Sequence, residues 1–296
     1  LKKSKRRFEA LVSEFDMKIA LINLPSPTQV VRRYMCSYNA PNFLFPPLEL
    51  LSVAAVAKER GGHQILLIDA IAENLSKETL LEKLEQFSPE FLMTITGFEI
   101  FEQDMRVLKW LRSSLSNTKF AVFGHYPTNF PQETIDIASL DFVLRNEPEL
   151  TLVELCAVLE AGESLDNVLG LSYRSIDGKV VNTPDRSRIK DLDSLPFPDY
   201  SLVNMNHYSE FLMPKPFAVI QTARGCAFEC SFCVRSYGAQ AGVRSPENIL
   251  EEISQLVKNQ GIRSFRFIDD TFTAKPSRTL EICERIQKEH PTITWS

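Results

Sequence analysis

The feature that most constrains the fold is an alternation, beginning at Met17, of short apolar runs with longer stretches of helical periodicity. Strands connected through helices form βαβ units, which build a parallel sheet covered by helices on both faces. We therefore predict an α/β fold whose front part is a doubly wound, parallel, five-stranded sheet. Ligands are expected at the carboxyl ends of its strands. The apolar runs lie at 18–24, 64–69, 91–96, 120–123 and 142–144, and the helices that separate or follow them lie at 47–60, 76–87, 101–115, 131–138 and 148–160.

Composition excludes several classes of protein. The 296 residues are 44% hydrophobic and 24% charged, which is typical of about two folded domains and not of a disordered chain. The net charge of −5 is opposite in sign to that of a general nucleic-acid binder, so we expect no nucleic-acid partner. No apolar stretch reaches about 18 residues, so we expect no membrane span. Six sparse cysteines without a secretory signal predict a reduced, cytoplasmic protein.

Four segments are predicted along the chain. Residues 1–16 form a charged N-terminal extension, and residues 17–162 form the front α/β domain. Residues 163–214 are interpreted as a linker that contains a hairpin, because Asp177-Gly178 is a hairpin turn pair. Residues 215–296 repeat a β-loop-α-β-α pattern that stops after about two units.

The segment 215–296 carries clear element boundaries. Ser245 is predicted as the cap of a helix with Pro246 at its first position, and Gly261 as its stop. A strand at 264–268 and a helix at 277–289 follow. Residues 292–296 resemble the start of another strand, so we expect the chain to be a truncated part of a longer one.

The strongest chemical signal is a run of three cysteines with the spacing C-x3-C-x2-C, at Cys226, Cys230 and Cys233. Thiolates are soft ligands that suit iron–sulfur clusters and zinc. Structural zinc sites almost always have four ligands, whereas only three are local here. A [4Fe–4S] cluster on three thiolates would leave one iron open, which favours catalysis. A zinc knuckle completed by a distant ligand, or chance core cysteines, are the alternatives.

The remaining cysteines and the next strand bear on this site differently. Cys156 and Cys283 have the helical spacing of core residues, and Cys36 is left open. Asp269-Asp270 follow a strand that is parallel to the one before the cysteines, so we expect both groups at one sheet edge. The alternative for these two aspartates is capping or solvation.

The segment Gln221 to Cys233 resembles the signature of the radical S-adenosylmethionine (SAM) superfamily. That resemblance implies a [4Fe–4S] cluster whose open iron chelates SAM, and an external one-electron reductant of the flavodoxin or ferredoxin type. The electron would cleave SAM into methionine and a 5′-deoxyadenosyl radical. It further implies that the metal ligands are Cys226, Cys230 and Cys233, that Phe232 lies by the adenine, and that the SAM amino group is contacted near Asp269, Asp270 and Thr271.

The front domain is similar to those of cobalamin-binding radical SAM proteins. Pro46-Pro47-Leu48 resembles the start of their first helix. Two turns match with departures: Phe123 and Asn146 stand where the family has glycine, and Phe123 is expected to crowd a corrin. No histidine is marked as a lower cobalt ligand. The resemblance implies a flavodoxin-like cobalamin-binding domain, then the first part of a partial (β/α) barrel, with cobalamin contacts at Gly124, His125, Pro127, Thr128 and Glu147.

These features predict a radical SAM enzyme, with cobalamin as a second cofactor, that transfers a methyl group to a small-molecule substrate or modifies it by radical chemistry. Catalytic residues are not identified, and the activity of a truncated barrel on its own is left open. The alternatives are a front domain that has lost cobalamin, given Phe123, and a non-catalytic metal-binding module. A methylthiotransferase is disfavoured, because the front half has only Cys36 and Cys156.

Overall fold

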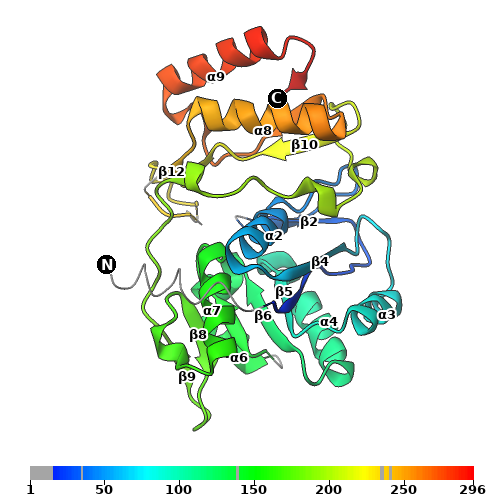
Figure 1. Cartoon of the computed structure of the whole chain (residues 1–296), viewed down its shortest axis with the longest axis vertical. Helices are drawn as coiled ribbons and strands as arrows, with labels where there is room; N and C mark the ends of the chain where they lie inside the picture. Colours follow the sequence, from blue (N-terminus) through cyan, green and yellow to red (C-terminus); the bar gives the residue numbers. More distant parts are fainter. Residues whose placement is uncertain (1–15, 35, 138–139, 234–236, 240–241) are drawn as a thin grey trace.

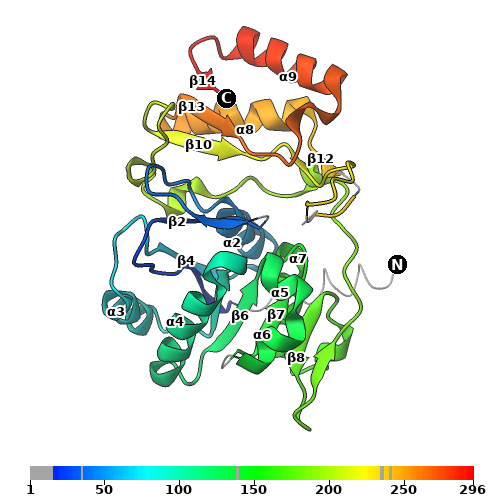
Figure 2. The same ribbon diagram turned by 180° about the vertical axis from the view of Figure 1, so that it is seen from behind.

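The structure is a computed structural model that describes residues 16–34, 36–137, 140–233, 237–239 and 242–296. The predicted charged extension therefore lies outside the described residues except for Asp16, and so does residue 138 of the predicted helix at 131–138. The described chain forms a large sheet with its helices, called the front unit here, and a smaller sheet stacked on it, called the second unit (Figures 1 and 2).

Within the described residues, the front unit holds a seven-stranded sheet of order β4-β1-β5-β6-β7-β8-β9. Its first five strands are parallel, as predicted, and follow the doubly wound order in which the second strand lies outside the first. These strands are β1 (Lys18–Asn23), β4 (Gln64–Asp69), β5 (Phe91–Ile95), β6 (Lys119–Phe123) and β7 (Phe142–Leu144).

The predicted hairpin lies in the front sheet, although we assigned it to the linker. Strand β8 (Leu171–Arg174) pairs antiparallel with β7, and β9 (Val180–Asn182) pairs with β8. The turn contains Gly178 at φ +84°. A strand at the edge of a sheet presents unpaired backbone groups, and the hairpin satisfies those of β7. The front sheet is therefore wider than the five parallel strands that alternation predicts.

Helices cover both faces of the front sheet because alternate strand residues point to opposite sides. Ala20 and Ile22 pack with α3 and α4, whereas Ile19 and Leu21 pack with the helices of the other face. The first group is α3 (Lys77–Phe87), α4 (Phe101–Ser114) and α6 (Pro131–Ile137), and the second is α2 (Leu48–Gly61) and α7 (Glu149–Ala161). Ser76 caps α3 as predicted, accepting a hydrogen bond from the Thr79 N–H at 3.1 Å.

Helix α2 lies between the two units (Figures 1 and 2). Every residue from Leu48 to Ala57 is buried, so α2 has no solvent face over that length. It shares one apolar core with the front sheet and with residues of the second unit such as Val219 and Ile253. The two units are therefore packed around a common helix.

The second unit, within the described residues, is a parallel sheet of order β10-β13-β14 with two helices. The predicted β-loop-α-β-α order is confirmed. Ser245 accepts a hydrogen bond from the Asn248 N–H at 3.1 Å at the start of the first helix, and Gly261 ends that helix at φ +68°. The elements are β10 (Phe217–Ile220), α8 (Pro246–Gln260), β13 (Ser264–Phe267), α9 (Pro276–Glu289) and β14 (Thr294–Trp295).

Several short elements have no counterpart in the predictions. Two are antiparallel pairs: β2 (Val30–Arg32) with β3 (Ser37–Asn39), and β11 (Ala223–Arg224) with β12 (Gly242–Val243). Helix α5 (His125–Asn129) follows β6 directly. Single 3-10 turns occur at Phe98–Ile100, Leu165–Asn167, Leu192–Ser194, Tyr200–Leu202, Met205–His207 and Phe272–Ala274. No helix in the described part of the chain is both long and apolar enough to cross a bilayer.

Candidate radical SAM and cofactor site

The cysteine loop (residues 225–233) follows β10 and β11 and meets the exit of β13. Asp269 Oδ1 accepts hydrogen bonds from the backbone N–H groups of Thr222 at 2.6 Å and Ala223 at 3.0 Å. Asp270 Oδ2 accepts one from the Gly225 N–H at 2.9 Å. Gly225 has φ +95°, a conformation that favours glycine. The structure thus brings the two predicted groups together at one sheet edge.

The three residues after β13 contribute differently. Both oxygens of Asp269 are used, because Oδ2 also accepts from the Thr222 hydroxyl. Asp270 Oδ1 is buried and has no hydrogen-bond partner among the described residues. Burial raises the pKa of both carboxyls, against the lowering effect of the hydrogen bonds each accepts. Thr271 Oγ1 lies 3.3 Å from Cys226 Sγ. Asp270 is therefore the one of the three with a buried acceptor left open to a ligand.

The thiols themselves are accessible and are not assembled into a metal centre. Cys226 is partly buried, whereas Cys230 and Cys233 are exposed. The Cys233 N–H donates to the Cys230 carbonyl at 3.0 Å, which makes a tight turn. No group of three metal-ligating side chains is close enough to hold an ion among the described residues. The donor set is three soft thiols on one short loop, which fits an iron–sulfur cluster.

Two aromatic side chains on the cysteine loop face outward. Phe232 is 89% exposed and Phe228 is 58% exposed. A large exposed apolar side chain next to predicted ligands provides a surface on which a planar ring can stack. Phe232 is therefore free to contact a ligand, as the resemblance implies.

In the front unit, Gly124 and His125 begin the turn after β6. Gly124 has φ +125°, and a Cβ there would lie 2.2 Å from the Thr96 carbonyl oxygen, so only glycine fits. His125 is buried against Phe98, with ring centroids 5.1 Å apart. Burial lowers the pKa of His125, and its Nε2 has no partner among the described residues. An imidazole nitrogen without a hydrogen-bond partner among the described residues thus lies at the predicted ligand edge.

Thr128 connects this turn with the next one. Its Oγ1 accepts a hydrogen bond from the Asn146 N–H at 3.0 Å and lies 3.3 Å from the Tyr34 hydroxyl. Pro127 is buried on the same short helix. Thr128 and Asn146 line an open cavity of about 530 Å³ whose walls are part polar and part apolar. Its other lining residues are Asn129, Pro131, Arg145, Asn182, Thr183, Pro184 and Asp185.

The expectation that Phe123 crowds a corrin is wrong. Phe123 is fully buried in the front core that also contains Leu51, because the last position of β6 points into the sheet packing. It presents no atom to the edge where a ligand would bind. Asn146 adopts φ +62°, so asparagine takes the left-handed conformation that the family's glycine would.

Glu147 faces the second unit. Its Oε1 accepts from Arg224 Nη1 at 2.9 Å, and its Oε2 accepts from the Ile189 N–H at 2.8 Å. Glu149 Oε1 accepts from Arg224 Nη2 at 2.7 Å. Burial, together with the neighbouring Glu149 charge, raises the pKa of Glu147 despite Arg224. Sequence reasoning missed Arg224, although its position two residues before Cys226 was a usable signal.

The strand order reverses between β1 and β5. The crevice at this point is filled by buried side chains of the front unit. Arg32, from β2, pairs with Asp104 on α4 at 2.7 Å, and both side chains are almost fully buried. Arg32 Nη1 also donates to Asn23 Oδ1 at 2.8 Å, and Thr96 Oγ1 donates to Asp104 at 2.7 Å. The crevice between β1 and β5 is therefore occupied by the protein's own side chains.

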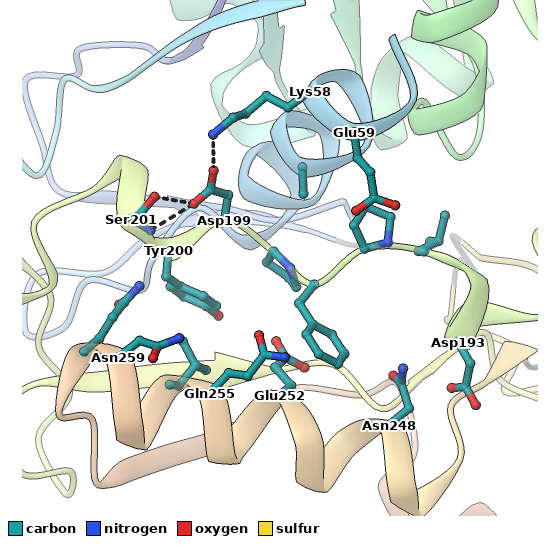
Figure 3. Close-up of a pocket in the computed structure, with 17 residues that line it drawn as sticks. Lys58, Glu59, Asp193, Asp199, Tyr200, Ser201, Asn248, Glu252, Gln255 and Asn259 are labelled. Carbon is teal, nitrogen blue, oxygen red and sulfur yellow. Dashed lines mark hydrogen bonds and ion pairs between the residues drawn. The ribbon is translucent and has the colours of Figure 1, made fainter. Parts of the chain in front are cut away.

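A cavity of about 860 Å³ lies elsewhere, between α2, the linker and α8 (Figure 3). Figure 3 shows Lys58 paired with Asp199 on one wall and Gln255 and Asn259 on the helix opposite. No cysteine lines it. It belongs to the packing between the units and lies apart from the cysteine loop.

Known proteins resemble this chain in sequence. Residues 220–296 match the model of the radical SAM superfamily. An uncharacterized methyltransferase of Pyrococcus horikoshii is 34% identical over 284 residues, which cover 95% of this chain and 59% of the relative. The anaerobic magnesium-protoporphyrin IX monomethyl ester cyclase of Rubrivivax gelatinosus is 27% identical over 258 residues, or 85% of this chain and 46% of that protein.

A solved structure matches both units. The cobalamin-dependent SAM radical enzyme OxsB, with aqua-cobalamin and SAM bound, superposes with a TM-score of 0.77 at 20% identity, covering 95% of this chain and 38% of that one. At that identity the likeness establishes the fold. Residues 220–296 therefore carry a radical SAM domain, which confirms the resemblance carried by the cysteine motif. The chain spans about half the length of the curated relatives it matches.

Proposed function

We propose that this chain is the cofactor-bearing part of a radical SAM enzyme that uses cobalamin as a second cofactor and modifies a small molecule, by methyl transfer in the first instance. The observation that carries the proposal is the cysteine loop at the shared carboxyl edge of β10 and β13. The alternative of a non-catalytic metal-binding module is not favoured by the relatives, which are named as a methyltransferase and a cyclase.

In this proposal Cys226, Cys230 and Cys233 hold the [4Fe–4S] cluster. Cys230 and Cys233 are exposed and so accessible to iron, and Asp270 Oδ1 supplies a buried acceptor for the SAM amino group. Phe232 is free to stack beside the adenine, because its ring is almost fully exposed. When bound, the cluster would supply the electron for SAM cleavage and cobalamin the methyl group to be transferred.

Cobalamin is proposed to bind at the carboxyl ends of β6 and β7, so that residues 17–162 form a flavodoxin-like cobalamin-binding domain. The unpaired His125 Nε2 and the open cavity beside Thr128 support this position. The burial of Phe123 removes the steric argument for a front domain that has lost cobalamin. A cytoplasmic location and an external reductant of the flavodoxin or ferredoxin type complete the proposal.

The cluster is tested by anaerobic reconstitution of the full chain with iron and sulfide. Wild-type protein is expected to gain the broad visible absorption of an iron–sulfur cluster and to cleave SAM when reduced. Replacing Cys226, Cys230 or Cys233 with Ala should remove the absorption, whereas Cys283→Ala, on α9, should keep it. A chain that binds zinc but takes up no iron would contradict the proposal.

Cobalamin is tested by equilibrium dialysis of the chain against hydroxocobalamin. Binding should weaken in Thr128→Val, which keeps the side-chain volume but removes the hydroxyl that faces Tyr34 and Asn146. Thr79→Val, in the cap of α3, is the control and should bind as wild type does. If wild-type protein binds no cobalamin while its cluster still cleaves SAM, the front domain has lost that cofactor.

A further inference from the structure

Arg224, two residues before the first cysteine, is held by the front unit. Its Nη1 donates to Glu147 at 2.9 Å and its Nη2 to Glu149 at 2.7 Å, so one guanidinium bridges two carboxylates at the start of α7. Its Nε donates to Gln221 Oε1 at 2.9 Å. All three charged side chains are at least nine-tenths buried. A buried, forked ion pair of this kind fixes the direction in which the chain enters the cysteine loop.

The far end of the loop is held by the same unit. Tyr237, four residues after Cys233, stacks on Tyr34 of the front unit with ring centroids 4.6 Å apart. Both tyrosines are almost fully buried. The Arg224 guanidinium carbon lies 5.5 Å from the Tyr237 ring centroid, so the two anchors meet. The chain therefore enters and leaves the cysteine loop against one buried cluster, formed by Glu147, Glu149, Arg224, Tyr34 and Tyr237, that we call the loop clamp.

The start and the middle of the loop differ in exposure. Cys230, Phe232 and Cys233 are exposed, whereas Gly225 is buried and Cys226 partly buried at the start of the loop. There the Gly225 N–H donates to Asp270, and Cys226 lies beside Thr271. The geometry in which the three thiols are offered to a ligand is thus set where the loop is anchored.

We propose that Glu147 and Glu149 act through Arg224 as positioning residues for the cysteine loop, and that the front unit thereby controls assembly and retention of the cluster. This inference rests on the proposed function and deepens it. It gives Glu147 a role other than the predicted cofactor contact, since both of its carboxylate oxygens are already engaged by protein groups. It also gives the front unit a task that does not require cobalamin.

The test uses the full chain and the double variant Glu147→Gln with Glu149→Gln, which keeps the size of both side chains but leaves the Arg224 charge unbalanced. Hydrogen exchange of the cluster-free protein should be faster by about 10-fold or more in peptides covering residues 225–233. After reconstitution, iron should be lost to a chelator about 10-fold or more faster, as for other groups that orient metal ligands.

The matched control is Asp104→Asn, which removes the charge of another buried ion pair in the front unit that does not touch the loop. It should leave exchange of the loop and retention of iron unchanged. If the double variant fails to fold by circular dichroism, Arg224→Lys replaces it, because an ammonium keeps the charge but cannot bridge two carboxylates in the same way.

The outcomes are separable from those of the proposed function. Wild-type exchange and iron retention in the folded double variant, or in Arg224→Lys, would overturn the loop clamp while leaving the cluster proposal intact. A wild-type chain that takes up no iron would overturn the proposed function, and the exchange measurement would still decide whether Glu147 and Glu149 order the loop. Faster exchange confined to residues 225–233 would support the clamp.

Discussion

The carboxyl edge of the front sheet and the cysteine loop both lie at the ends of parallel strands, but they differ in how they are stabilised. At the front edge, Arg32 and Asp104 form a buried ion pair, and Asp69 accepts hydrogen bonds from Asn23 and Tyr208. In the cysteine loop, Cys230 and Phe232 are exposed. The front edge is held in place by contacts within the protein, whereas side chains in the middle of the cysteine loop are exposed to solvent.

This difference indicates a division of labour. A preformed polar network is satisfied without a ligand, so its removal affects folding. Exposed thiols and aromatic rings contribute little to folding, so their removal affects binding. Substitutions at the front edge should therefore change stability most, and substitutions in the loop should change binding most.

Replacing Asp104 with Ala should destabilise the protein by about 3–5 kcal/mol, because it leaves the buried Arg32 charge without its partner. Urea unfolding monitored by circular dichroism measures the change. The control is Glu102→Ala on the same helix, where an exposed side chain lies 3.9 Å from Arg106, and its effect should be within about 0.5 kcal/mol. Equal effects of the two variants would show that the front edge is not stabilised by this pair.

Replacing Gly124 with Ala should destabilise by about 2 kcal/mol or more, because φ is +125° and the new Cβ would meet the Thr96 carbonyl oxygen. Gly162→Ala is the matched control: φ is +63° and nothing lies within 4 Å of its Cβ, so only the backbone cost of about 1 kcal/mol remains. Both free energies come from the same unfolding experiment. A larger loss of stability in Gly162→Ala than in Gly124→Ala would contradict the close approach of Gly124 to the Thr96 carbonyl oxygen.

Stability should fall as the pH is lowered through the ordinary histidine pKa of 6.5. Burial lowers the pKa of His125, partly opposed by Glu99, so the unfolded chain takes up a proton before the folded chain does. His63 contributes in the same direction for the same reason. Unfolding curves between neutral and mildly acidic pH measure the slope, which should become shallower in His125→Gln. An unchanged slope would show that folding does not shift the pKa of His125.

Replacing Phe232 with Ser should have the smallest effect on stability, within about 0.5 kcal/mol, because the ring is 89% exposed. The same substitution should weaken SAM binding to the reconstituted protein, measured by calorimetry. Leu280→Ser, at an exposed position of α9, is the control and should change neither quantity. If Phe232→Ser lost much stability but bound SAM normally, the loop residue would serve folding and not binding, contrary to this prediction.

Local patterns predicted the elements well. Ser245 and Pro246 placed the start of α8, and Asp177-Gly178 placed the hairpin turn, because caps and turns depend on residues that are neighbours in sequence. The three cysteines and Asp269-Asp270 were also placed correctly at one edge, since parallel strands must bring their ends together. The caps and turns follow from short-range rules, and the shared edge follows from the general geometry of parallel sheets.

Features that depend on residues distant in sequence could not be predicted from the sequence. The bond from Arg224 to Glu147 joins residues 77 positions apart, and no periodicity indicates it. Phe123 was judged from the glycine it replaces, although its orientation is decided by which face of β6 it occupies. The hairpin was placed in a linker because its pairing with β7 depends on a free sheet edge that sequence does not display.

Helix α2 has a practical consequence for anyone who dissects this protein. Residues Leu48 to Ala57 are enclosed by both units. A gene split at the linker would therefore leave each fragment with an exposed hydrophobic surface. Such fragments should be insoluble when made separately. They should become soluble when produced together, because each covers the hydrophobic surface of the other.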